Sequence, residues 1–178
     1  MKAIRWWVMW VVMSMLAVGA ACQAQTALSW EDAQASSGST EDAHGDVLII
    51  GGNVNGPSDV GGEATWTLDV GSKPIAQLSF TILTQGAHYR GKGIHATQPD
   101  GAVDIYVNEV LVHTIICTEP GGYGDYWPAT APIGSGSYAS GLIDVAGQGI
   151  QGPTLRITLV AQPFTAIDIN ALKVTVNG

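Results

Sequence analysis

Alternation of apolar and polar residues is the sequence feature that most limits how this chain can fold. It is clearest over residues 63–70, where Ala64, Trp66, Leu68 and Val70 occupy every second position. Successive side chains of a β-strand point to opposite faces, so this pattern predicts a strand with one buried and one wet face. No stretch after residue 24 has a convincing helical period.

Short β-type runs recur along the chain, and glycine and other turn residues separate them. The runs cover residues 47–50, 75–83, 102–116, 154–161 and 167–176. The third run reads as two strands that are joined through Asn108 and Glu109. Residues 31–45 are polar and small, which predicts a loop. This rhythm predicts an all-β domain, either a sandwich or a barrel of many short strands.

The N-terminal residues predict export. Lys2 and Arg5 precede an almost entirely apolar run over residues 6–18. That run is shorter than the roughly 20 residues that span a bilayer, but it suits the apolar part of a signal peptide. We therefore expect a secreted or cell-surface protein with no membrane insertion after processing.

Small residues follow the apolar run, so cleavage by signal peptidase is expected after Ala21 or Ala24. The chain then divides into a signal peptide, residues 1–24, and a single β-sandwich domain, residues 25–178. Lipid attachment to Cys22 is the alternative to simple secretion.

The mature domain is strongly acidic. Cleavage removes Lys2 and Arg5 while all 15 acidic residues remain, so the net charge changes from −8 to −10. Such a surface repels phosphate backbones and anionic lipids, which disfavours nucleic acid and membrane surfaces as partners. Acidic groups do attract calcium.

Several short motifs follow one another between Trp30 and Val176. They are the acidic start at residues 30–33, the glycine-led strand at 62–68, the hairpin at 106–109, the glycine-rich loop at 121–127, and the closing strands at 155–159 and 167–174. In this order they resemble the galactose-binding-like β-sandwich, in particular the calcium-dependent carbohydrate-binding modules. The resemblance implies a two-sheet antiparallel jelly-roll sandwich.

The resemblance also implies a structural calcium site. Glu31, together with Asp32, and Asp168 stand where an acidic residue of the first strand and an aspartate of the last strand meet in that family. Carboxylate oxygens are ligands that calcium takes. Asp168 is also a charge within an otherwise apolar run. The alternative is that Asp168 lies on the wet face of its strand.

Two positions depart from the family pattern. Glu109 stands where the hairpin usually has a turn glycine, and Ala166 stands where sugar-binding members often carry an asparagine. These departures leave the fold prediction unchanged, but they weaken the expectation of sugar binding.

The long segment at residues 119–141 is rich in glycine, proline and aromatic residues, and it is the best ligand candidate. Sugars present C–H faces that pack on aromatic rings, while carboxylates bind their hydroxyl groups. We expect Trp127, Tyr126 and Tyr123 to stack, Asp125 to hydrogen-bond, and Tyr89 to form the opposite wall. The alternative is that Trp127 closes the end of the core.

No catalytic motif is recognisable, so we do not expect an enzyme. The leading hypothesis is a secreted, non-catalytic carbohydrate-binding module for a glycan or polysaccharide, with a structural calcium. The alternative is a structural or adhesive extracellular protein, a matrix or filament subunit built on the same sandwich, which would self-associate.

Overall fold

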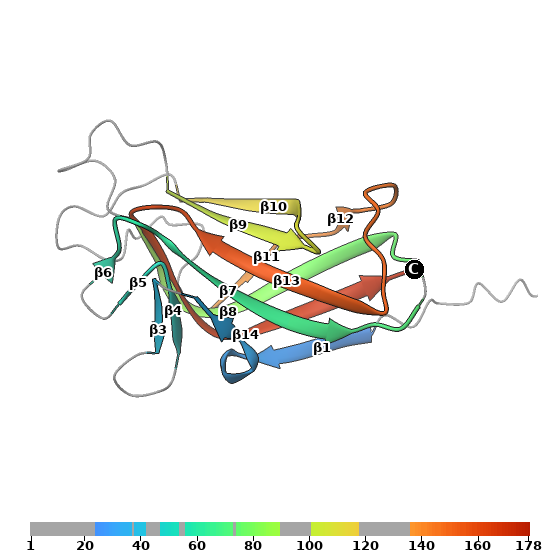
Figure 1. Cartoon of the computed structure of the whole chain (residues 1–178), viewed down its shortest axis with the longest axis horizontal. Coiled ribbons are helices and arrows are strands. Elements are labelled where there is room, and N and C mark those ends of the chain that lie inside the picture. The colour runs from blue at the N-terminus through green and yellow to red at the C-terminus, as the bar shows by residue number, and fades with distance from the viewer. Residues whose placement is uncertain are drawn as a thin grey trace, which may run out of the picture.

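The computed structural model describes residues 24–36, 38–41, 47–53, 56–72, 74–89, 101–117 and 136–178. The described residues form strands and one short 3-10 helix, η1 (Figure 1). The elements are β1 (Ala24–Ser29), η1 (Trp30–Asp32), β2 (Gln34–Ala35), β3 (Ser39–Glu41), β4 (Leu48–Ile50), β5 (Gly52–Asn53), β6 (Gly56–Pro57), β7 (Gly62–Asp69), β8 (Gln77–Tyr89), β9 (Gly101–Val107), β10 (Val110–Cys117), β11 (Gly136–Ala139), β12 (Ile143–Asp144), β13 (Thr154–Ala161) and β14 (Thr165–Asn177).

Two antiparallel sheets face each other. The first has the order β11-β8-β14-β4-β3, with β1 paired to β14 and β12 paired to β8, and the second has the order β10-β9-β13-β7-β2. The strands β5 and β6 form a separate small pair. The predicted all-β, two-sheet antiparallel sandwich is confirmed.

The alternation in the sequence becomes the core between the sheets. In β7 the side chains of Ala64, Trp66 and Leu68 are buried, and the residues between them are more exposed. The Trp66 indole Nε1–H donates to the carbonyl oxygen of Ser29, 2.8 Å away, which satisfies its one polar group inside the core. Aliphatic side chains fill most of the remaining interior.

Several elements extend beyond the sequence-based expectations. The run predicted at residues 75–83 belongs to β8, which continues to Tyr89. The segment at 31–45, predicted as a loop, contains η1, β2 and β3, and Gly136–Ala139 in the predicted long loop is the strand β11. The strand residues among them are extended because a neighbouring strand pairs with them. The helix η1 is instead closed locally by the capping box between Ser29 and Asp32.

Part of the sequence interpretation lies outside the described residues. The charged start and the apolar run of the signal peptide are there, as is Cys22. The described residues contain no helix that is long and apolar enough to cross a membrane.

Candidate functional site

Strand pairing fixes where Tyr89 and the segment that carries Trp127 join the sandwich. Tyr89, the last residue of β8, pairs with Thr165 at the start of β14. Gly101, the first residue of β9, pairs with Cys117, the last residue of β10. Because Val103 pairs with Ala161 at the end of β13, these strand ends lie together. We call this end of the sandwich, on the left in Figure 1, the loop end.

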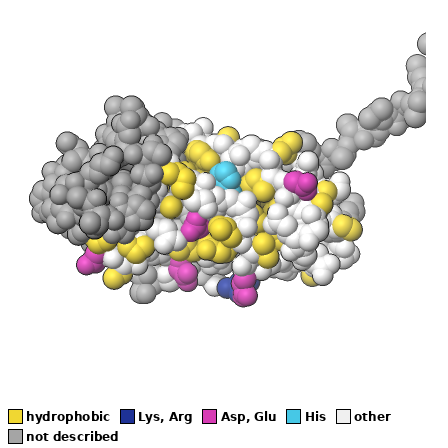
Figure 2. All heavy atoms as spheres, turned by 90° about the horizontal axis from the view of Figure 1, so that it is seen from above, with side chains coloured by type: hydrophobic (Ala, Val, Ile, Leu, Met, Phe, Trp, Pro, Cys, Tyr) yellow, Lys and Arg dark blue, Asp and Glu magenta, His cyan; other side chains and the backbone are white. Residues whose placement is uncertain are grey.

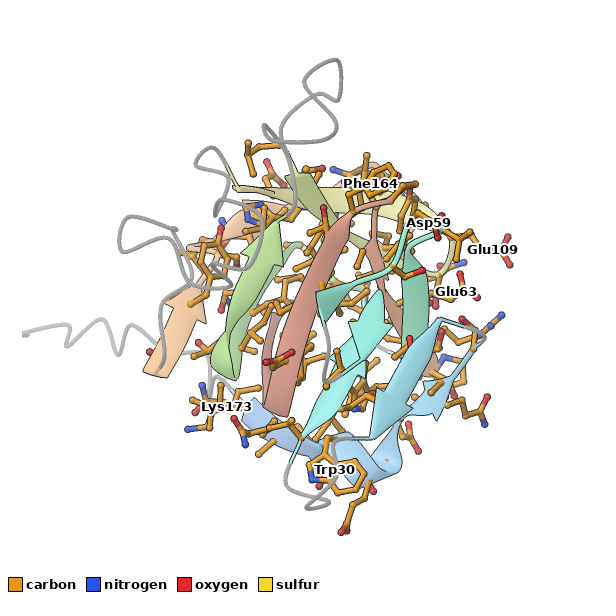
Figure 3. All side chains as sticks on the ribbon, turned by 90° about the vertical axis from the view of Figure 1, so that its left-hand side faces the viewer. Trp30, Asp59, Glu63, Glu109, Phe164 and Lys173 are labelled. Atoms are coloured by element: carbon orange, nitrogen blue, oxygen red, sulfur yellow. The ribbon has the colours of Figure 1, made fainter. Side chains whose placement is uncertain are left out.

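The turn between β13 and β14 is held at the loop end by hydrogen bonds with two other segments of the chain. We call it the rim turn; it consists of Gln162, Pro163 and Phe164. The Gln162 N–H donates to Ala102 O at 2.9 Å, and the Phe164 N–H donates to Ser58 O at 2.7 Å. Phe164 has a φ of 63°, the left-handed region that bulky residues rarely occupy. Figure 3, which views the loop end, shows Phe164 beside Asp59.

The Asp104 carboxylate anchors the Gln162 side chain of the rim turn. Asp104 lies on the outward face of β9 and accepts two hydrogen bonds, one through each oxygen. Thr114 Oγ1 donates to Oδ1 at 2.6 Å, and Gln162 Nε2 donates to Oδ2 at 2.7 Å. Asp104 therefore ties β10 and the rim turn to β9, and both of its oxygens are engaged.

The two residues predicted to bind calcium lie on different elements and differ in exposure. Glu31 is exposed on η1, whereas Asp168 is 9% exposed on β14, where it pairs with Ile49 and Gly86. The Asp32 carboxylate accepts from the Ser29 N–H at 2.9 Å and so caps η1. Within the residues that the structure describes, no three His, Cys, Asp or Glu side chains group together as a metal site.

A histidine and a tyrosine join the two sheets along one side of the sandwich. His113 Nε2 on β10 and Tyr138 Oη on β11 are 2.7 Å apart, and their rings are tilted by 34°. Burial lowers the pKa of His113 and raises the pKa of Tyr138. In the sequence, β10 precedes the segment that carries Trp127 and β11 follows it.

The aromatic prediction remains a prediction. Tyr123, Asp125, Tyr126 and Trp127 lie outside the described residues, and only the backbone of Tyr89 is described. The structure does not show Glu31 and Asp168 sharing a ligand.

Sequence reasoning missed the rim turn and its contact with Asp104. The only signal was the Gln-Pro-Phe break between two strands, which does not reveal the conformation of Phe164.

The fold and the loop end define a class of protein: a two-sheet antiparallel β-sandwich in which the ends of several strands lie together at one end. No protein-family model matches the sequence, and no curated protein matches it.

Solved structures that resemble the chain include carbohydrate-binding modules. The CBM36-1 domain of a multidomain xylanase from the hindgut metagenome of Trinervitermes trinervoides is 15% identical with a TM-score of 0.49, and the match covers 87% of this chain and 98% of that one. A family 35 module from Clostridium thermocellum is 14% identical with a TM-score of 0.48, covering 85% and 97% of the two chains.

A third similar structure is the C-terminal CBM6 of LamC, a marine laminarinase from Zobellia galactanivorans. It is 11% identical with a TM-score of 0.45, and the match covers 85% of this chain and 99% of that one. These three structures are carbohydrate-binding modules, the kind of domain that the sequence resembles. At these identities and TM-scores they assign no ligand to this chain.

Proposed function

We propose that this protein is an extracellular, non-catalytic carbohydrate-binding module that holds a glycan at the loop end. The observation that carries the proposal is the convergence of strand ends. Tyr89, itself a candidate, ends β8, and Cys117, which precedes the segment with the other candidates, ends β10 at the same end of the sandwich. A ligand that contacted Tyr89 and that segment would be held by one rigid frame.

The residue types of these candidates suit a sugar. Trp127, Tyr126 and Tyr123 supply flat rings for the C–H faces of a pyranose, and Asp125 accepts hydrogen bonds from its hydroxyl groups. Tyr89 forms the opposite wall in this proposal. Export through the N-terminal signal peptide would bring the domain to extracellular polysaccharides.

Replacement of Trp127 by alanine tests the proposal. Affinity electrophoresis in gels that contain laminarin, galactomannan or hydroxyethyl cellulose measures binding, and urea unfolding measures stability. We expect Trp127→Ala to lose retardation while its unfolding free energy stays within about 1 kcal/mol of the wild type, because an exposed ring contributes little to folding. Tyr126→Ala should weaken retardation by a smaller amount.

Trp30→Phe is the matched control, because Trp30 lies on η1, well away from Phe164 in the view of the loop end (Figure 3). It should keep full retardation. If Trp127→Ala instead lowers the unfolding free energy by roughly 3–5 kcal/mol, the loss typical of a core aromatic residue, the ring belongs to the core and the proposal fails.

A structural calcium is part of the proposal. Asp168 and Glu31 would supply carboxylate oxygens, and backbone carbonyls or water would complete the six to eight ligands that calcium takes. The exposed position of Glu31 leaves its carboxylate accessible to an ion. Bound calcium would contribute positive charge that holds η1 against β14.

One observation favours the alternative, a self-associating structural subunit. Leu111, Ile116 and Leu142, on or next to β10 and β12, are exposed, and hydrophobic side chains are spread over the face of the molecule in Figure 2. In the described residues β10 is an edge strand without a charged side chain, and such edges can pair with another chain. Size-exclusion chromatography separates the hypotheses: a glycan module can elute as a monomer, whereas a subunit should form dimers or larger species that Leu111→Lys dissociates.

A further inference from the structure

Hydrogen bonds with several segments hold the rim turn. Its backbone bonds to Ala102 and Ser58 are joined by a third, from the Thr165 N–H to Gln162 O at 3.0 Å. The Gln162 side chain adds the bond to Asp104. The turn is therefore fixed from β9 on one side and from the segment before β7 on the other.

Glycine at position 61 allows the second of these supports. Gly61 has a φ of 72°, and a Cβ added there would collide with the carbonyl oxygen of Ala161. The backbone before β7 can therefore lie directly against the rim turn. In the same segment, the Ser58 N–H donates to Gly51 O at 2.7 Å, which connects the support to the end of β4.

Phe164 adopts a costly backbone conformation within this frame. A bulky residue at a φ of 63° is strained, and such strain persists only where the surroundings over-determine it. Residues held in this way are concentrated at binding sites, where strain fixes a side chain in advance. The strain at Phe164 therefore motivates the hypothesis of a binding role.

The surroundings of Phe164 combine an apolar surface with carboxylates. Pro163 and Phe164 are partly exposed, and Val60 is 75% exposed. Asp59 and Glu63, which follow Ser58 along the chain, are also exposed. Figure 3 shows both carboxylates on the same side of the molecule as Phe164. An aromatic ring beside carboxylates can pack on a sugar's C–H face while the carboxylates accept hydroxyl hydrogen bonds.

We infer that Phe164 is a preorganised aromatic contact for a sugar ring at the loop end, and that the glycan bound there is neutral. The inference rests on the proposed function and deepens it. Asp59 and Glu63 repel uronates and sulfates, whereas they can accept hydrogen bonds from neutral hydroxyl groups. A ring held in place before binding loses little conformational entropy when the sugar arrives.

Phe164→Gly gives a test in which stability and binding move in different directions. Glycine adopts a φ of 63° without strain, so the variant should keep or raise the melting temperature. It should also reduce affinity about tenfold in gels of laminarin, galactomannan or hydroxyethyl cellulose, since an aromatic stack is worth about that factor. Val60→Ala, which keeps the turn and the ring, is the control and should bind within about twofold of the wild type.

Charge selection is tested with carboxymethyl cellulose and hydroxyethyl cellulose, which share a backbone and differ in charge. The wild type should be retarded less in the charged gel, and the double variant Asp59→Asn and Glu63→Gln should narrow that difference. If carboxymethyl cellulose retards the wild type more strongly than hydroxyethyl cellulose does, the inference that the bound glycan is neutral is wrong.

The remaining outcomes separate the inference from the proposed function. If Trp127→Ala loses binding but Phe164→Gly binds like the wild type, the inference fails and the proposed function stands. If Phe164→Gly unfolds, the ring is structural and the inference also fails. If no neutral polysaccharide retards the wild type, the proposed function fails and this inference falls with it.

Discussion

In two turns, residues other than glycine adopt the left-handed backbone conformation that glycine normally takes. The hairpin between β9 and β10 has Asn108 at a φ of 48° and Glu109 at 70°. Positive φ at both central residues is the requirement of a type I′ turn, which normally takes Asn-Gly. The hairpin was predictable from sequence because asparagine provides the turn signal, and it forms although glutamate replaces the expected glycine.

Contacts around Asn108 explain why the hairpin tolerates Glu109. The Asn108 N–H donates to Arg156 O, and the Arg156 N–H donates to Asn108 Oδ1, both at 2.9 Å. The ion pair between Arg156 and Glu109 is 3.9 Å long with both side chains largely exposed, so it contributes little. Asn108 thus fixes the turn to the backbone of β13 through both its own N–H and its side-chain oxygen, and Glu109 is carried into the left-handed region by the same turn.

Glu109→Gly should stabilise the protein. Glycine adopts a φ of 70° without the clash that a Cβ brings, and this gain exceeds the loss of an exposed ion pair. We expect the unfolding free energy, measured with urea, to rise by about 0.5–1 kcal/mol. Glu109→Ala keeps the Cβ and should give no gain. A decrease on Glu109→Gly would mean that the side chain matters more than the backbone.

At the scale of strands, the sequence reveals what is buried but not what is paired. The predicted run at residues 75–83 ends where polar residues and Gly86 begin, yet β8 continues because β14 pairs with it as far as Tyr89. The polar strand β3 likewise forms against the apolar β4. Both extensions depend on partners distant in the sequence, which a local pattern does not contain.

The contact between β10 and β11 should make stability depend on pH. Burial lowers the pKa of His113 below 6.5 in the folded protein, so the unfolded chain binds a proton first as the pH falls. Stability is therefore full above about pH 6.5 and is lost as the pH falls through the folded pKa. Tyr138 acts at the other limit, because its pKa is raised above 10.0 and stability is lost as the pH rises beyond that value.

Urea midpoints measured between pH 5 and 8 check the histidine part of this prediction. His113→Gln removes the titration but keeps a side chain that can bond to Tyr138, so the difference between variant and wild type should shrink toward acidic pH. His113→Gln and Tyr138→Phe should each leave the region between pH 7 and 9 flat. A difference that stays constant from pH 5 to 8 would show that His113 titrates equally in both states.

For the whole molecule, hydrophobic alternation predicted an all-β sandwich or barrel, because a sheet with one apolar face must bury that face. The choice of the two-sheet antiparallel sandwich came from the resemblance to a known family. The site was less predictable. The rim turn depends on tertiary hydrogen bonds from Gln162 and Phe164, and no residue pattern encodes them. The aromatic residues around Trp127 and the calcium pair remain predictions, since the first lie outside the described residues and the second are not shown to share an ion.

A calcium ion bound by Glu31 and Asp168 would link η1, near the start of the domain, to β14 at its end. If Glu31 and Asp168 share an ion, calcium at a hundredfold excess over its Kd stabilises the folded protein by about 2.7 kcal/mol. EDTA should then lower the melting temperature, and Asp168→Asn should abolish that response. Asp69→Asn, on the exposed face of β7, should keep it. An unchanged melting curve in EDTA, from protein shown by metal analysis to contain calcium, would refute the site.

The pairing of β1 with β14 has a mechanical consequence. Ala24 lies opposite Val176, so the start of β1 and the end of β14 emerge together at the end of the sandwich that faces away from the loop end (Figure 1). A domain attached to a surface through either of these strands would hold the loop end outward. A pulling force between the two strands would separate their antiparallel hydrogen bonds one after another, beginning at Ala24, so the domain should open at low force. A load applied between one of these strands and a polymer held at the loop end would instead act along the strands and strain many hydrogen bonds at once.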